Sequence, residues 1–329
     1  MNFPKLRLRR LRENPKLRRL TAESSLLVKD LVQPLFVKEG LRLPAPIASM
    51  PGQFQHSEES LVRESERLAR LGVSSVILFG IPARKDIHGR RAFAKKGIVQ
   101  RAIARIRKKA PSLLVIADVC LCEYLKHGHC GLIKNGKVDN DSTLKALARV
   151  AVSCAGAGAD VIAPSDMMDG RVAAIRAALD RGGFKDLPIL SYAVKYASSL
   201  YSPFRDAAEN APAFGDRGGY QMNAANAEEA IREARTDLEE GADMLLVKPA
   251  LAYGDIVRRL RERFSCPVGA FVVSGEYAMI KAAADRGWLD ERKAVIETHL
   301  GMKRAGASFL ITYWAAQLAR WSGKKDVLR

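Results

Sequence analysis

Three of the five cysteines of this 329-residue chain lie within eleven residues, at Cys120, Cys122 and Cys130, and two histidines lie among them. An aliphatic run at 113–117 leads into this segment and predicts a buried strand that ends in soft metal ligands. Thiolates with imidazoles nearby suit Zn²⁺ better than Mg²⁺ or Ca²⁺. The spacing is not that of a zinc finger. Three thiolates without a clear fourth ligand would leave a coordination position for water or substrate, as catalytic zinc sites do.

The alternative interpretation of this segment is three reduced cysteines buried at the end of a strand. Cys120 and Cys122 are separated by one residue, so on a strand they point to the same face. That arrangement is poor for simple packing, and it favours the metal site.

Two lysines follow apolar runs, Lys195 after 189–194 and Lys248 after 244–247. Taken alone, each lysine could equally well have a structural role, as a side chain that reaches solvent or as part of a buried ion pair. Together they suggest imine chemistry, because a lysine in a dry pocket beside a second cation loses basicity and its neutral amine can attack a ketone. Two such lysines in one site would imply that two carbonyl substrates are joined covalently.

The elements that must position these residues alternate along the chain. Short apolar runs predict eight strands, and most of them are separated by helical patterns rich in Ala, Glu and Arg. The predicted strands are 34–37, 75–79, 113–118, 160–164, 188–192, 243–248, 268–274 and 308–313, and the predicted helices are 58–72, 95–109, 142–157, 170–182, 226–240, 253–264 and 275–305. This alternation predicts an α/β fold, a (β/α)8 TIM barrel. An open doubly wound sheet is the alternative, but no G-x-G-x-x-G motif follows an early strand.

Polar residues stand at or just after the ends of six predicted strands, and the carboxyl ends of barrel strands form the catalytic face. They are Asp118, Ser165, Lys195, Lys248, Ser274 and Tyr313. The segment at about 197–222 is long for a connection between a strand and a helix, and it is rich in Pro, Gly, Arg and Asp. Such a loop predicts a lid over the active site.

Charge and composition exclude several classes of protein. The formal net charge is +18, and residues 5–19 carry eight basic side chains against one acidic side chain. Because this arm lacks aromatic residues for base stacking, we expect no nucleic-acid partner and assign residues 1–30 to subunit contacts. No apolar run reaches the roughly eighteen residues that span a bilayer, no secretory signal is seen, and clustered free cysteines fit a reducing cytoplasm.

Taken together, the motifs resemble those of the porphobilinogen synthase family, the 5-aminolevulinate dehydratases, over nearly the whole chain. The segments that carry the resemblance are 7–12, 97–100, 118–131, 163–171, 191–195, 203–207, 213–217, 220–222, 247–249 and 273–279. The resemblance implies the condensation of two molecules of 5-aminolevulinate to porphobilinogen, with loss of two waters, in tetrapyrrole (heme) biosynthesis. It also implies a catalytic barrel over 31–329.

The resemblance further implies roles for individual residues. Lys195 and Lys248 resemble the pair that forms Schiff bases, with Lys248 holding the first substrate. Asp118 and Ser165 resemble polar partners of the substrate amine. The remaining site residues resemble carboxylate clamps, formed by Arg205 and Arg217 for one substrate and by Ser274 and Tyr313 for the other.

The metals implied by the resemblance are Zn²⁺ on Cys120, Cys122 and Cys130 and an allosteric Mg²⁺ near Glu233, for which an ordinary surface glutamate is the alternative. His129 would orient water or a ligand near the zinc. The family is typically homo-octameric, with the N-terminal arm wrapped around an adjacent barrel. Where many members have a second basic residue after the lid arginine, this chain has Gly218, which predicts a looser lid and weaker substrate binding.

Two other functions remain as alternatives. A class I aldolase would use one lysine, and the second lysine and the three thiolates argue against it. A basic nucleic-acid-binding protein is the other.

Overall fold

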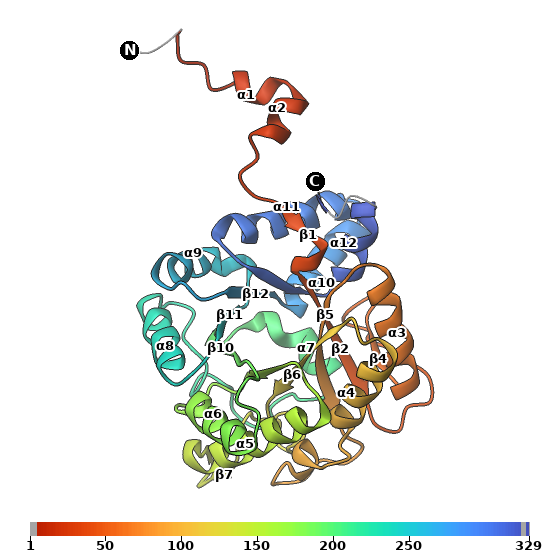
Figure 1. Cartoon of the computed structure of the whole chain (residues 1–329), viewed down its shortest axis with the longest axis vertical. Helices are drawn as coiled ribbons and strands as arrows, with labels where there is room; N and C mark the ends of the chain where they lie inside the picture. Colours follow the sequence, from red (N-terminus) through yellow and green to blue (C-terminus); the bar gives the residue numbers. More distant parts are fainter. Residues whose placement is uncertain (1–4, 324–326, 329) are drawn as a thin grey trace.

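The computed structural model describes residues 5–323 and 327–328, and its centre is a barrel of eight parallel strands (Figure 1). The strands run in the order β10, β11, β12, β13, β2, β5, β6 and β9, and the Ile162–Ile189 bridge joins the two ends. Their bounds are β2 Leu31–Lys38, β5 Ser75–Ile81, β6 Leu114–Val119, β9 Val161–Pro164, β10 Leu190–Lys195, β11 Met244–Lys248, β12 Val268–Val272 and β13 Phe309–Thr312. The predicted (β/α)8 barrel and its eight strands are confirmed.

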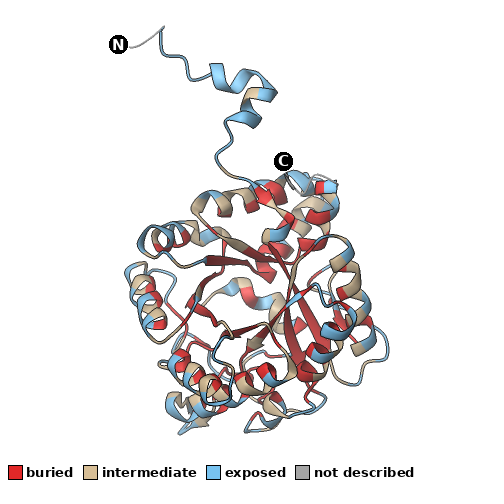
Figure 2. Cartoon of the chain, viewed as in Figure 1, coloured by how far each residue is buried: buried red, intermediate tan, exposed pale blue. Residues whose placement is uncertain are grey.

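The barrel strands are apolar runs because the helices cover their outer faces and the opposite strands cover their inner faces. Every residue of β9, β10 and β12 is buried. Figure 2 shows the buried residues concentrated on the strands and on the helix faces turned toward them. The hydrophobic core therefore lies in the barrel and in the layer beneath the helices.

Helices surround the barrel, and six of the seven predicted ones are present with shifted ends. The surrounding helices are α3 Glu58–Arg70, α4 Ile98–Lys109, α5 Asn140–Ala157, α6 Arg171–Arg181, α8 Glu228–Glu239, α9 Gly254–Arg263, α10 Ser274–Asp285, α11 Glu291–Ala305 and α12 Ala315–Ser322. Short strands lie between them at β3 Ala45–Pro46, β4 Phe54–His56, β7 Ile133–Lys134 and β8 Lys137–Val138.

The single helix predicted at 275–305 is wrong, because the chain forms α10 and α11 there. Gly287 adopts a left-handed conformation with φ of 71°, and this conformation ends the first helix. Asp290 then caps the second helix by accepting a hydrogen bond from the Lys293 N–H at 2.9 Å. The helix α12, after the last strand, was not predicted.

Two Gly-Ala-Asp turns connect helices to strands. Gly158 and Gly241 have φ of 98° and 106°, a conformation that favours glycine. The aspartates two residues later accept hydrogen bonds from the backbone of the neighbouring strand: Asp160 from Val115 N–H and Asp243 from Ile189 N–H, each at 2.8 Å. These bonds fix where the strands begin.

The lid predicted at 197–222 is an irregular loop whose two ends pair with each other. Ala197 N–H donates to the Met222 carbonyl at 2.8 Å, and Met222 N–H donates to the Lys195 carbonyl at 3.0 Å. Within the loop lie the short 3-10 helix η3 Ser199–Tyr201 and the helix α7 Ser202–Ala207, which Figure 1 shows over the middle of the barrel.

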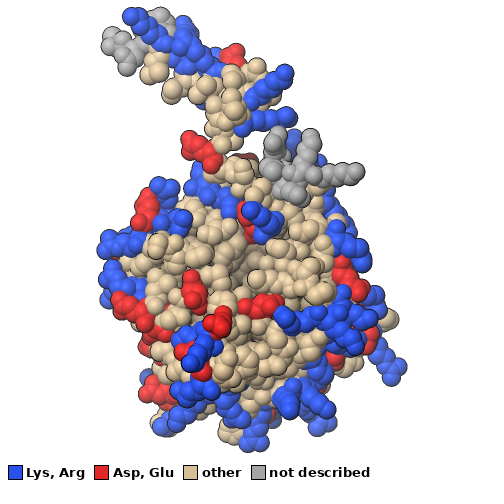
Figure 3. Space-filling view, viewed as in Figure 1, with Lys and Arg blue, Asp and Glu red and all other residues tan. Residues whose placement is uncertain are grey.

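The N-terminal arm extends away from the barrel and carries the helices α1 Arg10–Glu13 and α2 Pro15–Leu20 (Figure 1). Its residues are largely exposed, with Leu8 69 % and Leu20 80 % exposed. Lys and Arg are dense on the arm and scattered among acidic residues on the visible face of the barrel (Figure 3). Among the described residues, no helix has the length and apolar character needed to cross a membrane.

Candidate active site

Lys195 and Lys248 lie side by side because they end adjacent strands in matching register. Lys195 is the last residue of β10 and pairs with Lys248, the last residue of β11. Both lysines are 5 % exposed. Two ammonium groups buried together are unfavourable, so this register favours a neutral amine on at least one lysine.

The surroundings of Lys248 are aromatic. Its Nζ lies 4.2 Å from the ring centroid of Phe271, 5.0 Å from that of Phe204 and 5.3 Å from that of Tyr192. Burial and, as a smaller cause, the charge of Lys195 lower the pKa of Lys248 to about 7, against the opposing effect of Asp118. At neutral pH a large share of this lysine is therefore an uncharged nucleophile.

Asp118, at the end of β6, lies on the same wall as Ser165. The Ser165 hydroxyl donates to Asp118 Oδ2 at 3.1 Å, and Lys195 Nζ donates to the Ser165 backbone carbonyl. Burial and, as a smaller cause, the charge of Glu123 raise the pKa of Asp118 to about 7, against the lowering effect of the two lysines. Because a carboxyl group with this pKa is present in both protonation states near neutral pH, Asp118 can give and take a proton.

The three predicted metal ligands come together behind this wall. The Sγ atoms of Cys120, Cys122 and Cys130 all lie within 4.8 Å of one another, and all three residues are buried. Burial raises the pKa of the Cys120 and Cys122 thiols, so a cation is needed to hold them as thiolates. Three converging sulfur atoms fit a soft tetrahedral ion that keeps one further position.

Neither histidine of the cysteine segment belongs to this sulfur group. His129 contacts the lid with both ring nitrogens: Nδ1 lies 3.1 Å from Tyr220 Oη and Nε2 lies 2.9 Å from the Phe214 carbonyl. His127 contributes its backbone carbonyl, which accepts a hydrogen bond from Ala213 N–H at 3.0 Å. The segment thus joins the sulfur group to the lid.

The lid supplies the two arginines. Arg217 Nη2 donates to the carbonyls of Gly128 and Asn210 at 2.9 and 2.8 Å. Arg205 keeps a buried Nε that has no hydrogen-bond partner among the described residues, and burial, followed by the charge of Arg217, lowers its pKa. The buried Nε of Arg217 also has no partner among the described residues, and two nearby guanidinium groups with free donors are suited to a carboxylate.

One cavity connects these groups. Its lining includes six of the predicted site residues and one cysteine: Asp118, Cys122, Ser165, Lys195, Arg205, Arg217 and Lys248. The volume of the cavity is about 20 Å³, which is roughly the space of one water molecule. Tyr201, Phe204, Arg205 and Arg217 of the 197–222 loop therefore lie close to the two lysines.

Ser274 and Tyr313 lie next to this cavity rather than on its lining. Ser274 Oγ accepts a hydrogen bond from Phe204 N–H at 2.9 Å and donates to the Leu200 carbonyl at 3.3 Å. The Tyr313 ring lies 6.1 Å from that of Phe271, and its buried hydroxyl has no partner among the described residues. Phe271 is therefore a near neighbour of both Tyr313 and Lys248.

Glu233 lies elsewhere, in a polar cleft between the lid and α8 whose lining also includes Asp169 and Glu229. Burial raises the pKa of Glu233, and the charge of Asp237 raises it further. Among the described residues, the cysteines form the one group of three candidate ligand atoms close enough for a metal, and Glu233 is not in it.

Glu123 and Asn210 are site residues that the sequence analysis missed. Glu123 is buried on the cavity wall, and Asn210 Nδ2 donates to Glu123 Oε1 at 3.0 Å and to Cys122 Sγ at 3.1 Å. The position of Glu123 directly after Cys122 was a usable signal. Asn210 lies 88 residues after Cys122 and gave no signal.

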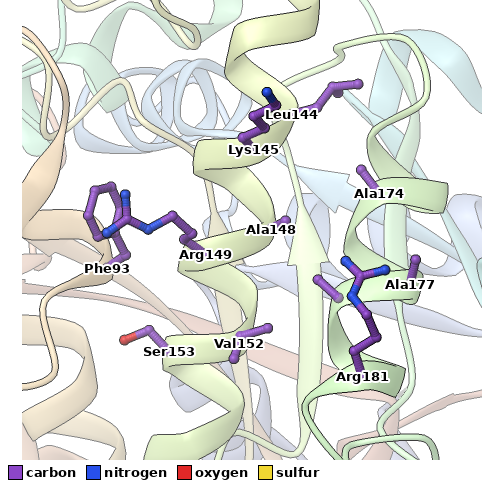
Figure 4. Close-up of a pocket in the computed structure, with 11 residues that line it drawn as sticks. Phe93, Leu144, Lys145, Ala148, Arg149, Val152, Ser153, Ala174, Ala177 and Arg181 are labelled. Carbon is purple, nitrogen blue, oxygen red and sulfur yellow. The ribbon is translucent and has the colours of Figure 1, made fainter.

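A larger hollow of about 740 Å³ lies on the outer helix layer, between α5 and α6 (Figure 4). Its lining is mostly alanine and other apolar residues, with Arg149 placed 3.8 Å over the ring of Phe93. None of the strand-end residues lines it, so the chemistry of the chain lies in the small cavity.

Comparison with known proteins agrees with this geometry. The family model for delta-aminolevulinic acid dehydratase matches residues 5–321. The delta-aminolevulinic acid dehydratase of Halalkalibacterium halodurans is 54 % identical over 96 % of each chain, and that of Bacillus subtilis is 52 % identical over 96 % of this chain and 97 % of its own.

A solved structure agrees as well. The crystal structure of delta-aminolevulinic acid dehydratase (porphobilinogen synthase) from Toxoplasma gondii ME49, in complex with the reaction product porphobilinogen, is 42 % identical with a TM-score of 0.94. The match covers 96 % of this chain and 91 % of that one. This chain therefore belongs to the delta-aminolevulinic acid dehydratase family.

Proposed function

We propose that this chain condenses two molecules of 5-aminolevulinate to porphobilinogen with loss of two waters, a step of heme biosynthesis, and that Lys195 and Lys248 carry the two substrates as imines. Membership of the family and the likeness to a product complex support the reaction. The observation that carries the assignment of the lysines is their pairing at the ends of adjacent strands in one buried cavity.

In the proposed reaction every bond formed and broken is accounted for, and both lysines end as free amines. The neutral amine of Lys248 adds to the C4 ketone of the first substrate and expels one water, and Lys195 does the same with the second. One carbon–carbon bond forms between C3 of the molecule on Lys195 and C4 of the molecule on Lys248. One carbon–nitrogen bond forms between the amine of the molecule on Lys248 and C4 of the molecule on Lys195. Each bond formation releases one lysine as a free amine, so the two waters are those lost on imine formation.

The other residues of the cavity move protons and hold carboxylates. Asp118, supported by the Ser165 hydroxyl, takes a proton from the reacting carbon or amine. Arg205 and Arg217 bind the carboxylate of one substrate. Ser274 and Tyr313 bind that of the other, which requires Ser274 to exchange its bond to Leu200 for one to substrate.

Metal sites complete the proposal. Cys120, Cys122 and Cys130 would hold Zn²⁺, which supplies a Lewis acid next to the cavity when it is bound. Glu233 would bind an allosteric Mg²⁺ in the acidic cleft beside the lid.

The arm, residues 1–30, would contact a neighbouring subunit of a homo-octamer in the cytoplasm through its exposed leucines, while 31–329 would form the catalytic barrel with its lid.

The activity is tested by incubating the protein and Zn²⁺ with 5-aminolevulinate and measuring pyrrole by an aldehyde colour reaction. Pyrrole should form with the wild-type protein and fall to background with Lys248→Met. A wild-type protein that forms no pyrrole would disprove the proposed function.

A further inference from the structure

Glu276, in the first turn of α10, has no role in the reaction described so far. It is fully buried, with 0 % exposure. Burial raises its pKa to about 7, although three backbone N–H groups act to lower that pKa. Because a buried carboxyl group is costly unless several donors compensate it, a position that served packing alone would be apolar.

The two oxygens of Glu276 hold two different segments of the chain. Oε1 accepts hydrogen bonds from Ala250 N–H at 3.2 Å and from Leu251 N–H at 2.7 Å. These residues follow Lys248 by two and three positions. Glu276 therefore fixes the backbone just beyond the lysine proposed to hold the first substrate.

Oε2 holds the beginning of α10. It accepts a hydrogen bond from Val273 N–H at 2.6 Å, and the next residue is Ser274, proposed to bind a substrate carboxylate. One carboxyl group thus ties the end of β11 to the start of α10, over a gap of more than twenty residues in the chain.

The start of α10 is also pressed against the lid. A Cβ on Gly275 would lie 2.5 Å from the Leu200 carbonyl oxygen, so only glycine allows this approach. Ser274 bonds to the backbone of Phe204 and Leu200 in the same place. With the lid on one side and Glu276 on the other, Ser274 has little freedom to move relative to Lys248.

We infer that Glu276 is a positioning residue that fixes the separation between Lys248 and Ser274, and that this separation selects keto acids by the number of carbons between ketone and carboxylate. The inference rests on the proposed function and adds one assignment, that the molecule bound through its ketone carbon to Lys248 has its carboxylate at Ser274. A keto acid with the matching number of carbons between ketone and carboxylate contacts Lys248 and Ser274 at once. A keto acid with one carbon fewer or one more contacts only one of these two residues.

Imine trapping tests this selection on the wild-type protein. The protein is incubated with 3-oxobutanoate, 4-oxopentanoate or 5-oxohexanoate, reduced with borohydride, and the label on Lys248 is measured by mass spectrometry. The 4-oxo acid has the ketone-to-carboxylate spacing of 5-aminolevulinate, and we expect it to label Lys248 at least about tenfold faster than the other two, a difference of about 1.4 kcal/mol. Equal labelling by all three acids would overturn the inference.

Two variants test the part played by Glu276. In Glu276→Asp the side chain is one methylene shorter and cannot reach both segments. In Glu276→Gln an amide nitrogen replaces one carboxylate oxygen, and this nitrogen cannot accept a hydrogen bond from the backbone N–H group that faces it. Both should lose most of the tenfold selection while Lys248 is still labelled. The control is Asp243→Asn, which removes a carboxylate bonded to a backbone N–H at the opposite end of β11, and it should keep the selection.

The outcomes separate this inference from the proposed function. No label on Lys248 with any acid, and no pyrrole from 5-aminolevulinate, would disprove the proposed function itself. Pyrrole formation together with unchanged selection in a folded Glu276→Asp protein would leave the function standing and disprove the role of Glu276. Because the comparison of the three acids uses the wild-type protein, it tests the selection among keto acids even if a variant loses stability.

Discussion

Replacing Lys195 with glutamine should raise the pKa of Lys248. The Nζ atoms of Lys195 and Lys248 lie 5.8 and 5.3 Å from the same ring centroid, that of Tyr192, so they are at most about 11 Å apart. At that distance and an effective dielectric constant of about 20, two unit charges repel by about 1.5 kcal/mol. This energy corresponds to about one pKa unit and is a lower bound, because a shorter separation gives more.

The sign of the effect follows from the form of lysine that reacts. Only the neutral amine attacks the ketone, so imine formation rises as pH rises through the pKa of Lys248, about 7. Raising that pKa by about one unit leaves roughly five times less neutral amine at pH 7. The pKa should still stay below the ordinary value of 10.5, because burial, the larger cause, is unchanged.

The assay is borohydride trapping of 5-aminolevulinate on Lys248, measured by mass spectrometry from about pH 6 to about pH 10. Lys195→Gln abolishes the second imine but leaves the first one measurable, and its half-maximal labelling should move up by at least about one pH unit. Lys195→Arg keeps the charge and should leave the midpoint where it is in the wild-type protein. Identical midpoints for the glutamine and arginine variants would refute the electrostatic reasoning.

Other predictions test the remaining parts of the site. Asp118→Asn should lower pyrrole formation by about 10²–10⁴-fold without unfolding, as the loss of a general acid–base group does, and an unchanged rate would exclude that role. Cys130→Ser should lower the zinc retained after dialysis, measured by elemental analysis, whereas full retention would show that the three sulfurs are not the ligands. Arg217→Ala should raise KM and speed backbone hydrogen exchange in 210–221, because it removes the bonds to Gly128 and Asn210, and unchanged exchange would contradict that anchoring. Leu78→Ala, at a fully buried position of β5, should cost about 2–5 kcal/mol of unfolding free energy in denaturant titration, and a loss below about 1 kcal/mol would contradict tight packing there.

Most of the barrel could be predicted because its strands are short apolar runs and its turns use local chemistry. Gly158 and Gly241 adopt the left-handed conformation expected of Gly-Ala-Asp turns. The split between α10 and α11 was missed because the helical pattern of apolar residues continues on both sides of Gly287. A single glycine in such a pattern does not reveal that it has a positive φ.

The site residues that lie at the ends of strands could be predicted from the sequence. The contacts between segments far apart in the sequence could not. Lys195 and Lys248 were found because the ends of barrel strands converge. Asn210 reaches Cys122 from the lid, and Glu276 reaches back to Leu251. Neither contact follows from periodicity or spacing, because each depends on how the loops fold over the barrel. The position of Tyr313 next to Phe271 likewise depends on how the rings of two neighbouring segments pack.

The closed cavity of about 20 Å³ has a thermodynamic consequence for substrate affinity. A molecule the size of 5-aminolevulinate exceeds this volume, so binding must draw on conformations in which the groups that line the cavity lie further apart. The apparent dissociation constant is then the intrinsic constant divided by the open fraction. Substitutions that weaken the contacts of His129 or Asn210 with their partners would change the measured affinity without touching the ligand, and metal bound at Cys122 would act on the same equilibrium.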